Sequence, residues 1–299
     1  MAVLKLFLVS LVLIAVLIDA KLLFPALAQH GPKIVQKLEI VEEETNAQLP
    51  RHFDHTFPAP RLNASAKAAY NFAVDITAYG SVSTFQCLYQ QGYNAIFIQA
   101  YSPANGGSIN PNLIQNLNNA VSAKLGTEVY VTPATGKTGQ TQFDTVFNKF
   151  KNSGINVRSI WLQVTSPINW SNNVQTNVNL IQSFVNRANS NGVSAGIYTN
   201  WYDWQQITGS YTAFNGLRLW YWNSLGQGQN SESAATFDDF RTFSGWVKPA
   251  VKQFAVNENL CGLTLNRDVF PSGSKSVDVA AVEETNSNVE NKLTVGGFV

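Results

Sequence analysis

The chain has 299 residues, of which 45% are hydrophobic and only 13% are charged. This composition supplies enough apolar side chains for a large core in one or two domains. The formal net charge is +1, and there is no dense run of Lys and Arg. The sequence therefore lacks the electrostatic pattern of a nucleic-acid-binding protein, and an uncharged or mixed-charge substrate fits it better.

The first twenty residues have the pattern of a secretion signal. Lys5 precedes a largely apolar run over residues 6–18, and small residues follow at Ala20 and again at Ala28. We expect a signal peptide over residues 1–20, with cleavage as late as residue 28 as the alternative. The run is shorter than the ~20 apolar residues of a membrane-spanning helix. We therefore predict a secreted, extracellular protein without a membrane span, with lysosome-like vesicles as another destination.

The segments on either side of the central region lack the pattern of a packed domain. Residues 21–69 mix basic, acidic and proline-containing pieces without a sustained period, which predicts a propeptide or linker. Residues 271–299 are rich in Ser, Val, Glu and Asn, which is typical of a disordered tail. The remaining residues, 70–270, are expected to form one domain.

Within residues 70–270, short apolar runs alternate with helix-periodic stretches, each of which ends at a glycine. In chain order we expect a strand at 72–76, a helix at 84–91 closed by Gly92, a strand at 95–98, a helix capped by Asn110 and stopped by Gly126, a strand at 128–132, a helix around Phe143–Phe150 closed by Gly154, a strand at 159–164, a helix at 173–191 closed by Gly192, a strand at 194–199, and three more strands at 217–222, 251–256 and 262–268.

This order of elements predicts an α/β fold. Strands that alternate with helices form a parallel sheet, and eight strands suffice to close a TIM-like barrel. The last three strands are joined by loops and at most short helices, so the barrel is not regular throughout. An open doubly wound sheet is the alternative fold.

The only two cysteines are Cys87 and Cys261. In an oxidising compartment we expect them to form a disulfide, which closes a long loop and could contribute ~4 kcal/mol of stability. Two buried free thiols are the alternative.

In a barrel of this kind, the reactive side chains lie at the C-terminal ends of the strands. The residues expected there are Asp75, Gln99, Tyr101, Thr132, Gln163, Thr165, Tyr198, Asn200, Trp222, Gln253, Asn266 and Asp268. Asp75 is the most informative, because a charge between Val74 and Ile76 is costly unless it faces a wet opening or a partner. Hydrogen bonding at the strand end, without a role in a site, is the alternative.

Aromatic residues gather after the fifth and sixth strands. They are Tyr198, Trp201, Tyr202, Trp204, Trp220, Tyr221 and Trp222. Aromatic faces of this kind stack against sugar rings, whereas the alternative is ordinary core packing. Trp220 and Trp222 lie two residues apart and share one face of a strand, so core packing accounts for this pair or for Tyr221 but not for all three.

No cofactor or metal site can be assembled from the sequence. The three histidines, His30, His52 and His55, all precede the domain, so we expect neither a histidine-based metal site nor a Ser–His–Asp arrangement within it. The stretch Gly136-Lys137-Thr138 lacks the upstream glycine spacing of a phosphate-binding loop.

Five motifs in order carry a resemblance to a known family. They are YNFAVD at 70–75, VRSIWLQVT at 157–165, GIYTNWYDW at 196–204, LWYW at 219–222 and KQF at 252–254. Over about residues 70–270 the chain resembles the amoeba-type invertebrate lysozymes of nematodes, within the family-25 glycoside hydrolases. The resemblance implies a barrel of five β/α units followed by three strands. It also implies cleavage, without a metal, of the β-1,4 bond between N-acetylmuramic acid and N-acetylglucosamine in bacterial peptidoglycan.

The resemblance assigns some site residues and leaves others in doubt. The first-strand aspartate of the family corresponds to Asp75, and both Asn266 and Asp268 lie near the position of its last-strand aspartate. The fourth-strand Asp-x-Glu of the family is replaced by Gln163-Val164-Thr165. Glycoside hydrolysis usually needs a carboxylic acid to protonate the leaving oxygen and a second carboxylate at the sugar cation, and an amide with a hydroxyl provides neither.

Two hypotheses follow. The first is a secreted lysozyme for antibacterial innate defence or digestion of bacteria, with Asp75 as one catalytic carboxylate and Asp203 or Asp268 as a displaced second one. The other is a catalytically degenerate defence protein that binds peptidoglycan on the same scaffold. In both, the residues expected to bind sugar are Gln163, Thr165, Tyr198, Trp201, Trp222 and Gln253.

Overall fold

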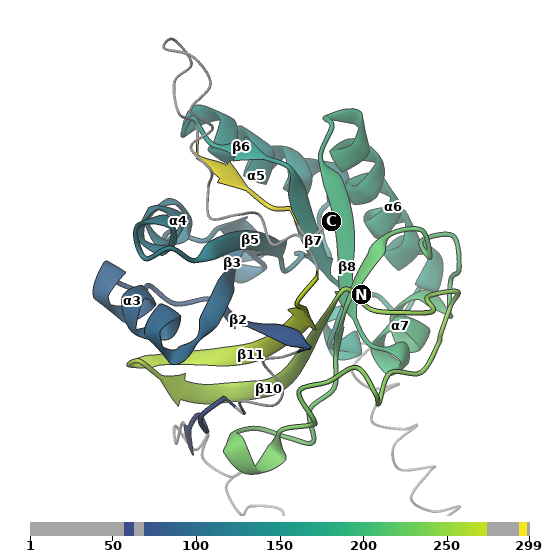
Figure 1. Ribbon diagram of the computed structural model, residues 1–299. Helices are drawn as coiled ribbons and strands as arrows, with labels where there is room; N and C mark the ends of the chain where they lie inside the picture. The colour runs from purple at the N-terminus through teal and green to yellow at the C-terminus, as the bar shows by residue number, and fades with distance from the viewer. Residues whose placement is uncertain (1–56, 63–68, 274–292, 298–299) are drawn as a thin grey trace, which may run out of the picture. The chain divides into compact units, whose positions relative to one another are not determined.

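The structure is a computed structural model that describes residues 57–62, 69–273 and 293–297 (Figure 1). The predicted signal peptide and the three histidines lie outside the described residues, as do most of the predicted linker and tail. The main strands are β2 (Tyr70–Ile76), β3 (Tyr93–Ser102), β5 (Gly126–Val131), β7 (Ser159–Gln163), β8 (Ser194–Thr199), β9 (Arg218–Trp222), β10 (Val251–Leu260) and β11 (Leu263–Pro271). The helices are α3 (Val82–Gln91), α4 (Leu113–Ser122), α5 (Gly139–Asn152), α6 (Val174–Ser190) and α7 (Trp201–Thr208).

These eight strands close into a barrel, because β10 pairs with both β11 and β9. The strands from β2 to β10 run parallel along this path, and β11 is antiparallel to both of its neighbours, β10 and β2. Five strand–helix units followed by three strands are therefore confirmed, and the open doubly wound sheet is wrong. Sequence alone did not indicate the reversed direction of β11.

The barrel strands are apolar on both faces because each face packs against a different core. Val74 and Ile76 of β2 point outward, into the layer between the barrel and its helices. Ala73 points inward, toward a core of aromatic rings. This division explains why the strands read as continuous hydrophobic runs in the sequence.

The inner core is organised around Trp220. Its ring stacks on Tyr198, with centroids 4.0 Å apart, and it contacts Phe97 and Trp161 at 4.5 and 6.0 Å. Gly196 provides room for Trp161, because a Cβ at this position would lie only 2.4 Å from the indole ring. A larger residue at Gly196 would therefore displace an aromatic ring from the centre of the barrel.

The glycines in the sequence correctly predicted most of the helix ends. Gly92, Gly154 and Gly192 all adopt a positive φ after α3, α5 and α6. The predicted ends of α4 were wrong. Asn112 precedes this helix rather than Asn110, and Gly126 begins β5 instead of ending the helix.

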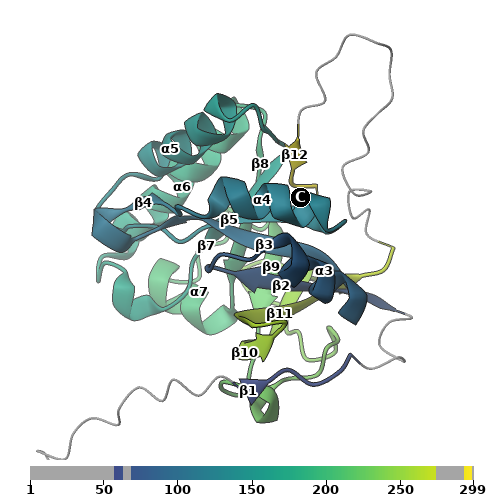
Figure 2. The same cartoon turned by 90° about the vertical axis from the view of Figure 1, so that its left-hand side faces the viewer.

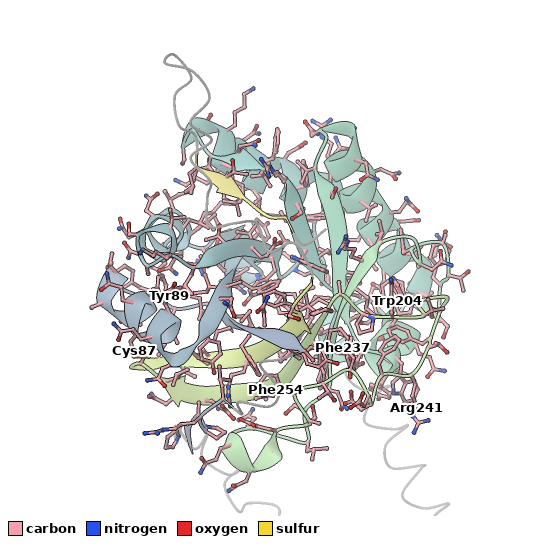
Figure 3. The ribbon with its side chains drawn as sticks, in the orientation of Figure 1. Cys87, Tyr89, Trp204, Phe237, Arg241 and Phe254 are labelled. Carbon is pink, nitrogen blue, oxygen red and sulfur yellow. A yellow bond between two sulfur atoms is a disulfide. The ribbon has the colours of Figure 1, made fainter. Side chains whose placement is uncertain are left out.

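A long loop covers the outer face of β10, where a regular barrel would have helices. Lys252, which is fully buried, donates hydrogen bonds to the carbonyl oxygens of Ala234 (2.6 Å) and Thr236 (3.0 Å), and it pairs with Asp239 at 2.8 Å. Arg267, also buried, pairs with Glu232 of the same loop. Figure 3 shows Phe237 and Arg241 along this loop and Phe254 on the strand. Two buried cations on the barrel thus anchor the loop by polar contacts, whereas a helix at this position would pack through an apolar face.

The β10–β11 hairpin is tied to the first helix. Its tip residue Cys261 forms a disulfide with Cys87 of α3, as expected from the sequence, across a separation of 174 residues. In Figure 1 the turn between β10 and β11 lies on the side of α3, where Figure 3 labels Cys87.

Two short strands lie in segments that the sequence analysis placed outside the domain. β1 (Phe57–Pro58), within the predicted linker, pairs with β10 beside Glu258 and Asn259 (Figure 2). β12 (Thr294–Val295), within the predicted tail, pairs with β6 (Asn156–Val157). The prediction of a disordered tail is wrong for residues 293–297, where Val295 is fully buried.

Removing the disulfide should destabilise the protein. Replacing both Cys87 and Cys261 by Ser is expected to lower the free energy of unfolding by about 2–5 kcal/mol, because the unfolded chain regains the freedom of a very long loop. Chemical denaturation of the oxidised protein and the double variant measures this difference. A reducing agent should bring the wild type to the stability of the variant and leave the variant unchanged; equal stability of all forms would contradict the prediction.

Candidate functional site

The C-terminal ends of the parallel strands form one end of the barrel, which we call the mouth. Asp75, near the end of β2, is buried there. Its Oδ2 accepts a hydrogen bond from Nε2 of Gln253 at 2.6 Å, and its Oδ1 accepts one from Nδ2 of Asn266 at 2.8 Å. Two amide donors therefore aim at a single carboxylate, which favours its ionised form.

Asp268 lies beneath Asp75 and is completely buried. Its Oδ1 accepts a hydrogen bond from the indole Nε1 of Trp220 at 2.9 Å, whereas its Oδ2 accepts from no donor among the described residues. The two carboxyl groups lie close enough that each affects the pKa of the other. A proton on Asp268 would remove the repulsion between two adjacent negative charges.

Burial and mutual repulsion set the protonation of this pair. Burial raises the pKa of Asp75 to about 6, against the opposing effect of its amide donors. Burial and the neighbouring charge of Asp75 raise the pKa of Asp268 well above its usual range. We conclude that Asp268 holds the proton and Asp75 carries the charge.

The reversed direction of β11 explains how both candidates for the last-strand position reach the mouth. Asn266 pairs directly with Asp75, and Asp268 pairs with Ala73 one step deeper. Because alternate residues share a face of the sheet, Asn266 and Asp268 both point into the barrel. The sequence analysis placed them at the C-terminal end of this strand, but the mouth is at the other end of β11.

Asp203 forms a second acidic centre, separate from the pair. It lies in the first turn of α7, and its backbone N–H donates to Oδ1 of Asn200, which caps the helix, at 2.7 Å. Its Oδ2 accepts from Nε1 of Trp222 at 2.9 Å, and its carboxylate accepts from the backbone N–H of Ser166. Burial raises the pKa of Asp203, while these two donors oppose the rise.

Ser166 reaches this position through an unusual backbone. Its φ of 58° and ψ of 72° place a non-glycine residue in the left-handed region. Such a conformation is disfavoured, by roughly 1–2 kcal/mol, and persists where the surrounding structure imposes it. Here it directs a backbone N–H at the Asp203 carboxylate.

Neutral side chains form a continuous hydrogen-bonded row across the other side of the mouth. Asn110 donates to Gln99 (3.5 Å), Gln99 to Thr132 (2.8 Å), Thr132 to Gln163 (2.5 Å), and Gln163 to Thr165 (3.0 Å). Gln163 and Thr165 thus occupy the Asp-x-Glu positions of the resemblance with their hydrogen bonds largely directed to each other. They lie at the mouth, as predicted, but they provide no acid there.

Two residues predicted to bind sugar are buried and hold other side chains instead. The Tyr198 hydroxyl donates to Oε1 of Gln253 at 2.9 Å, and Gln253 uses its amide nitrogen for Asp75. Both side chains lie inside the barrel, beneath the surface that a ligand could touch. We therefore correct their role from sugar contact to positioning of Asp75.

The aromatic residues divide between core and surface as the strand period requires. Trp220 belongs to the inner core and Tyr221 to the outer layer, so the two side chains point to opposite faces of β9. The expectation that core packing would account for only one of these faces is wrong, because both faces of the barrel are packed. Trp222 is half-buried beside Asp203. Trp201 and Tyr202, at the start of α7, are 57% and 51% exposed, with ring centroids 6.0 Å apart.

Sequence reasoning missed three residues of the mouth. Asn110 was taken for a helix cap, but its side chain enters the neutral row. Asn257, with a φ of 57° at an irregularity of β10, donates its backbone N–H to Oδ1 of Asn266 and so turns the amide of Asn266 toward Asp75. The backbone of Ser166 had no signal, because no side chain distinguishes it.

The described part of the chain has neither a metal-binding cluster nor a membrane-spanning helix. Residues 57–62, 69–273 and 293–297 include no cluster of three or more His, Cys, Asp or Glu side chains arranged for a metal ion. The same ranges include no helix that is long and apolar enough to cross a membrane.

Comparison with known proteins assigns the chain to a family. The family model described as "Lysozyme-like protein 1" matches residues 66–254. Lysozyme-like protein 7 of Caenorhabditis elegans is 42% identical over 258 residues, covering 85% of this chain and 88% of the relative. The chain belongs to the lysozyme-like protein family. A probable GH family 25 lysozyme 2 of Dictyostelium discoideum is 31% identical over 200 residues, 66% of this chain and 90% of that protein.

Solved structures show the same barrel as this lysozyme-like chain. A bacterial lysozyme from Streptomyces coelicolor aligns with a TM-score of 0.55 at 18% identity, over 70% of this chain and 95% of that one. A muramidase from Trichobolus zukalii aligns with a TM-score of 0.52 at 22% identity, over 72% of this chain and 100% of that one. At such identities the likeness concerns the fold.

The carboxyl pair of this lysozyme-like chain should make its stability depend on pH. Groups whose folded-state pKa is raised bind protons more tightly when folded, so their stabilisation is present at low pH and is lost as the pH rises. For Asp75 this loss falls between its usual value of 3.8 and about 6, and burial of Glu258, whose pKa rises to about 7, acts in the same direction. The melting temperature is therefore expected to fall between about pH 4 and pH 7.

Asp268→Asn tests the origin of this dependence. An asparagine can accept from Trp220 and is neutral, as the protonated acid is, so the fold should persist while the pH dependence becomes shallower. Thermal unfolding across the pH range measures the slope. Asp144→Asn, at an ion pair with Arg187 on the outer helices, is the matched control and should leave the slope unchanged. An unaltered slope in Asp268→Asn would contradict the assignment of the proton to Asp268.

Proposed function

We propose that the protein is a secreted lysozyme-type glycoside hydrolase that acts on the β-1,4 bonds of bacterial peptidoglycan, in antibacterial defence or digestion of bacteria. Its membership of the lysozyme-like family and its similarity to GH family 25 lysozymes support the substrate class. The observation that carries the proposal is the mouth itself: a charged carboxylate from a buried pair and a separate protonatable acid, beside exposed aromatic rings.

Asp203 is the proposed general acid. Its raised pKa favours the protonated form, which can donate to the leaving oxygen of a glycosidic bond. After donation, the N–H groups of Trp222 and Ser166 are already oriented toward the resulting carboxylate. The strained backbone of Ser166 thus supplies a preformed donor at the place where charge develops.

Asp75 is the proposed anionic partner. Gln253 and Asn266 fix the orientation of its carboxylate, and the proton on Asp268 keeps a second negative charge out of the barrel. A single oriented negative charge can stabilise the positive charge that develops on a sugar ring during cleavage. Gln253, Asn266 and Asp268 act through Asp75 in this account and need not touch the substrate.

Exposed rings at the mouth offer a surface for the sugar. Trp201 and Tyr202 follow β8 directly and stand beside the helix turn that carries Asp203. The nearly perpendicular arrangement of their rings, with an interplanar angle of 83°, presents two differently directed faces. We propose that Trp201 and the half-buried Trp222 contact the glycan on either side of Asp203.

Substitution of the proposed acid tests the mechanism. Asp203→Asn should lower the rate at which the protein clears a suspension of purified peptidoglycan by ~10²–10⁴-fold, because the leaving oxygen loses its proton donor. Retention on insoluble peptidoglycan should stay unchanged, which separates catalysis from binding. Asp144→Asn on the outer helix α5 is the control. Full clearing activity in Asp203→Asn would remove Asp203 from the mechanism.

A second function is favoured by the neutral row at the mouth. Gln163 and Thr165 occupy positions that the family resemblance gives to carboxylates, and their mutual hydrogen bond of 3.0 Å forms part of a largely satisfied neutral network. On this account the protein binds peptidoglycan without cleaving it and acts as a defence protein. Asp75 then serves as a hydrogen-bond acceptor on the floor of a binding site in the mouth.

Restoring the missing carboxylates separates the two functions. If the natural protein is a binder, the double variant Gln163→Asp with Thr165→Glu should acquire peptidoglycan-clearing activity that the wild type lacks, with glycan retention unchanged. The variant Gln163→Met with Thr165→Val, which removes the same hydrogen bonds without adding a carboxylate, controls for loss of the neutral network. Clearing by the wild type would reject the binding-only function, and failure of the wild type to bind peptidoglycan would reject both.

A further inference from the structure

The end of the barrel opposite the mouth, which we call the base, gathers most of the exposed cations of the domain. The base consists of the last turns of the helices, the loops that lead from each helix to the next strand, and the N-terminal ends of the strands. Six exposed cations lie there: Lys124, Lys149, Lys151, Arg158, Arg218 and Lys248. They come from separate parts of the chain, which is why the sequence contains no basic run.

These six cations have no carboxylate partners in the described part of the chain. The ion pairs found there use Arg187, Lys252 and Arg267 instead. The carboxylate nearest the base on the barrel strands, Glu128, is buried and accepts from Trp161 at 2.9 Å and from Ser159 at 3.2 Å. The ion pairs of the described residues thus leave these six exposed cations outside them.

The barrel fixes how the cations are spread. Lys124 precedes β5, Arg158 precedes β7, Arg218 begins β9 and Lys248 precedes β10. The order β5–β7–β8–β9–β10 is continuous around the barrel, and neighbouring strands lie about 4.8 Å apart. The four cations thus follow an arc of about 20 Å, with Lys149 and Lys151 beside it on the last turn of α5.

This pattern suits a flexible polymer with repeated negative groups better than a bilayer or a nucleic acid. In the described last helix turns and helix-to-strand loops, the large apolar side chains exposed are Tyr89, Tyr211 and Val247. Stable membrane anchoring needs more apolar contact than this. Binding of single-stranded nucleic acid usually adds a row of aromatic rings for base stacking, and two tyrosines on separate segments do not form such a row.

We propose that the base binds an anionic polysaccharide, a chain bearing repeated phosphate, carboxylate or sulfate groups, while the mouth remains open to neutral glycan. The two ends of the barrel then recognise two different components of one surface. For a protein that works on a bacterial wall, a role that rests on the proposed function, the base would hold the molecule by charge while the mouth meets the glycan strand.

Charge reversal at the base tests this proposal with the full chain. Wild-type protein should be retained on immobilised dextran sulfate and elute with salt. The triple variant Arg158→Glu, Arg218→Glu, Lys248→Glu should elute at much lower salt, and its slope of log affinity against log salt should decrease by roughly 3. All three side chains are exposed, so equal melting temperatures are expected and should be verified.

A matched control carries the same change in net charge at other places. Arg61→Glu, Lys137→Glu, Arg241→Glu alters three exposed cations outside the base, and Figure 3 shows Arg241 on the outer loop. This variant should keep most of the retention. Equal loss in both triple variants would mean that net charge, not the base, governs binding, and it would overturn the proposal.

The remaining arms distinguish the partner and separate this proposal from the proposed function. Stronger binding to anionic phospholipid vesicles or to a DNA oligonucleotide than to dextran sulfate at equal salt would assign the base to another partner and reject the polysaccharide. Trp201→Ala should weaken retention on purified peptidoglycan without affecting dextran sulfate. A wild type that binds peptidoglycan but not dextran sulfate would reject the base alone.

Discussion

One buried proton organises the mouth of this barrel. Asp75 and Asp268 share an interior lined by aromatic rings, where two adjacent negative charges would be prohibitively costly. With the proton on Asp268, the deeper carboxyl is neutral and accepts from Trp220, and Asp75 is left as an oriented anion. The amides of Gln253 and Asn266 are useful only because that anion exists. The central stack of Trp220 on Tyr198 therefore supports the chemistry as well as the core, since each ring also holds one polar contact of the network.

Much of this architecture could be predicted from local sequence patterns. The strands are recognisable because each is apolar on two faces, and Gly92, Gly154 and Gly192 mark helix ends because a positive φ is required there. Asp75 stood out for an equally local reason, a charge between apolar neighbours. The pairing of the only two cysteines needed no geometry, only an expected compartment. These features depend on a few consecutive residues or on composition.

The features that could not be predicted depend on contacts between distant segments. The direction of β11 follows from its pairing with β2, and this direction determines that Asn266, rather than the strand's last residues, meets Asp75. The positioning roles of Tyr198 and Gln253 appear only when β8 and β10 are placed in one barrel. Likewise, the loop that Lys252 and Arg267 anchor takes the place of helices, and no hydrophobic periodicity in its sequence predicts this position. Asn110 was misassigned as the helix cap because the helix begins later: Oδ1 of Asn110 accepts from the backbone N–H of Asn112, while its Nδ2 donates to the distant carbonyl oxygen of Thr77.

The junction between the first and last strands of the barrel affects how the protein folds during synthesis. β2, the first strand of the barrel, pairs on one side with β11, the last, so that Tyr70 meets Pro271. During synthesis β2 can pair with β3 early, but its other edge waits until nearly the whole domain has emerged. An open strand edge of this kind is prone to pair with other chains, and long-range closure is slow. Newly made chains are thus most exposed to misassembly just before the final hairpin arrives, while the second edge of β2 is still unpaired.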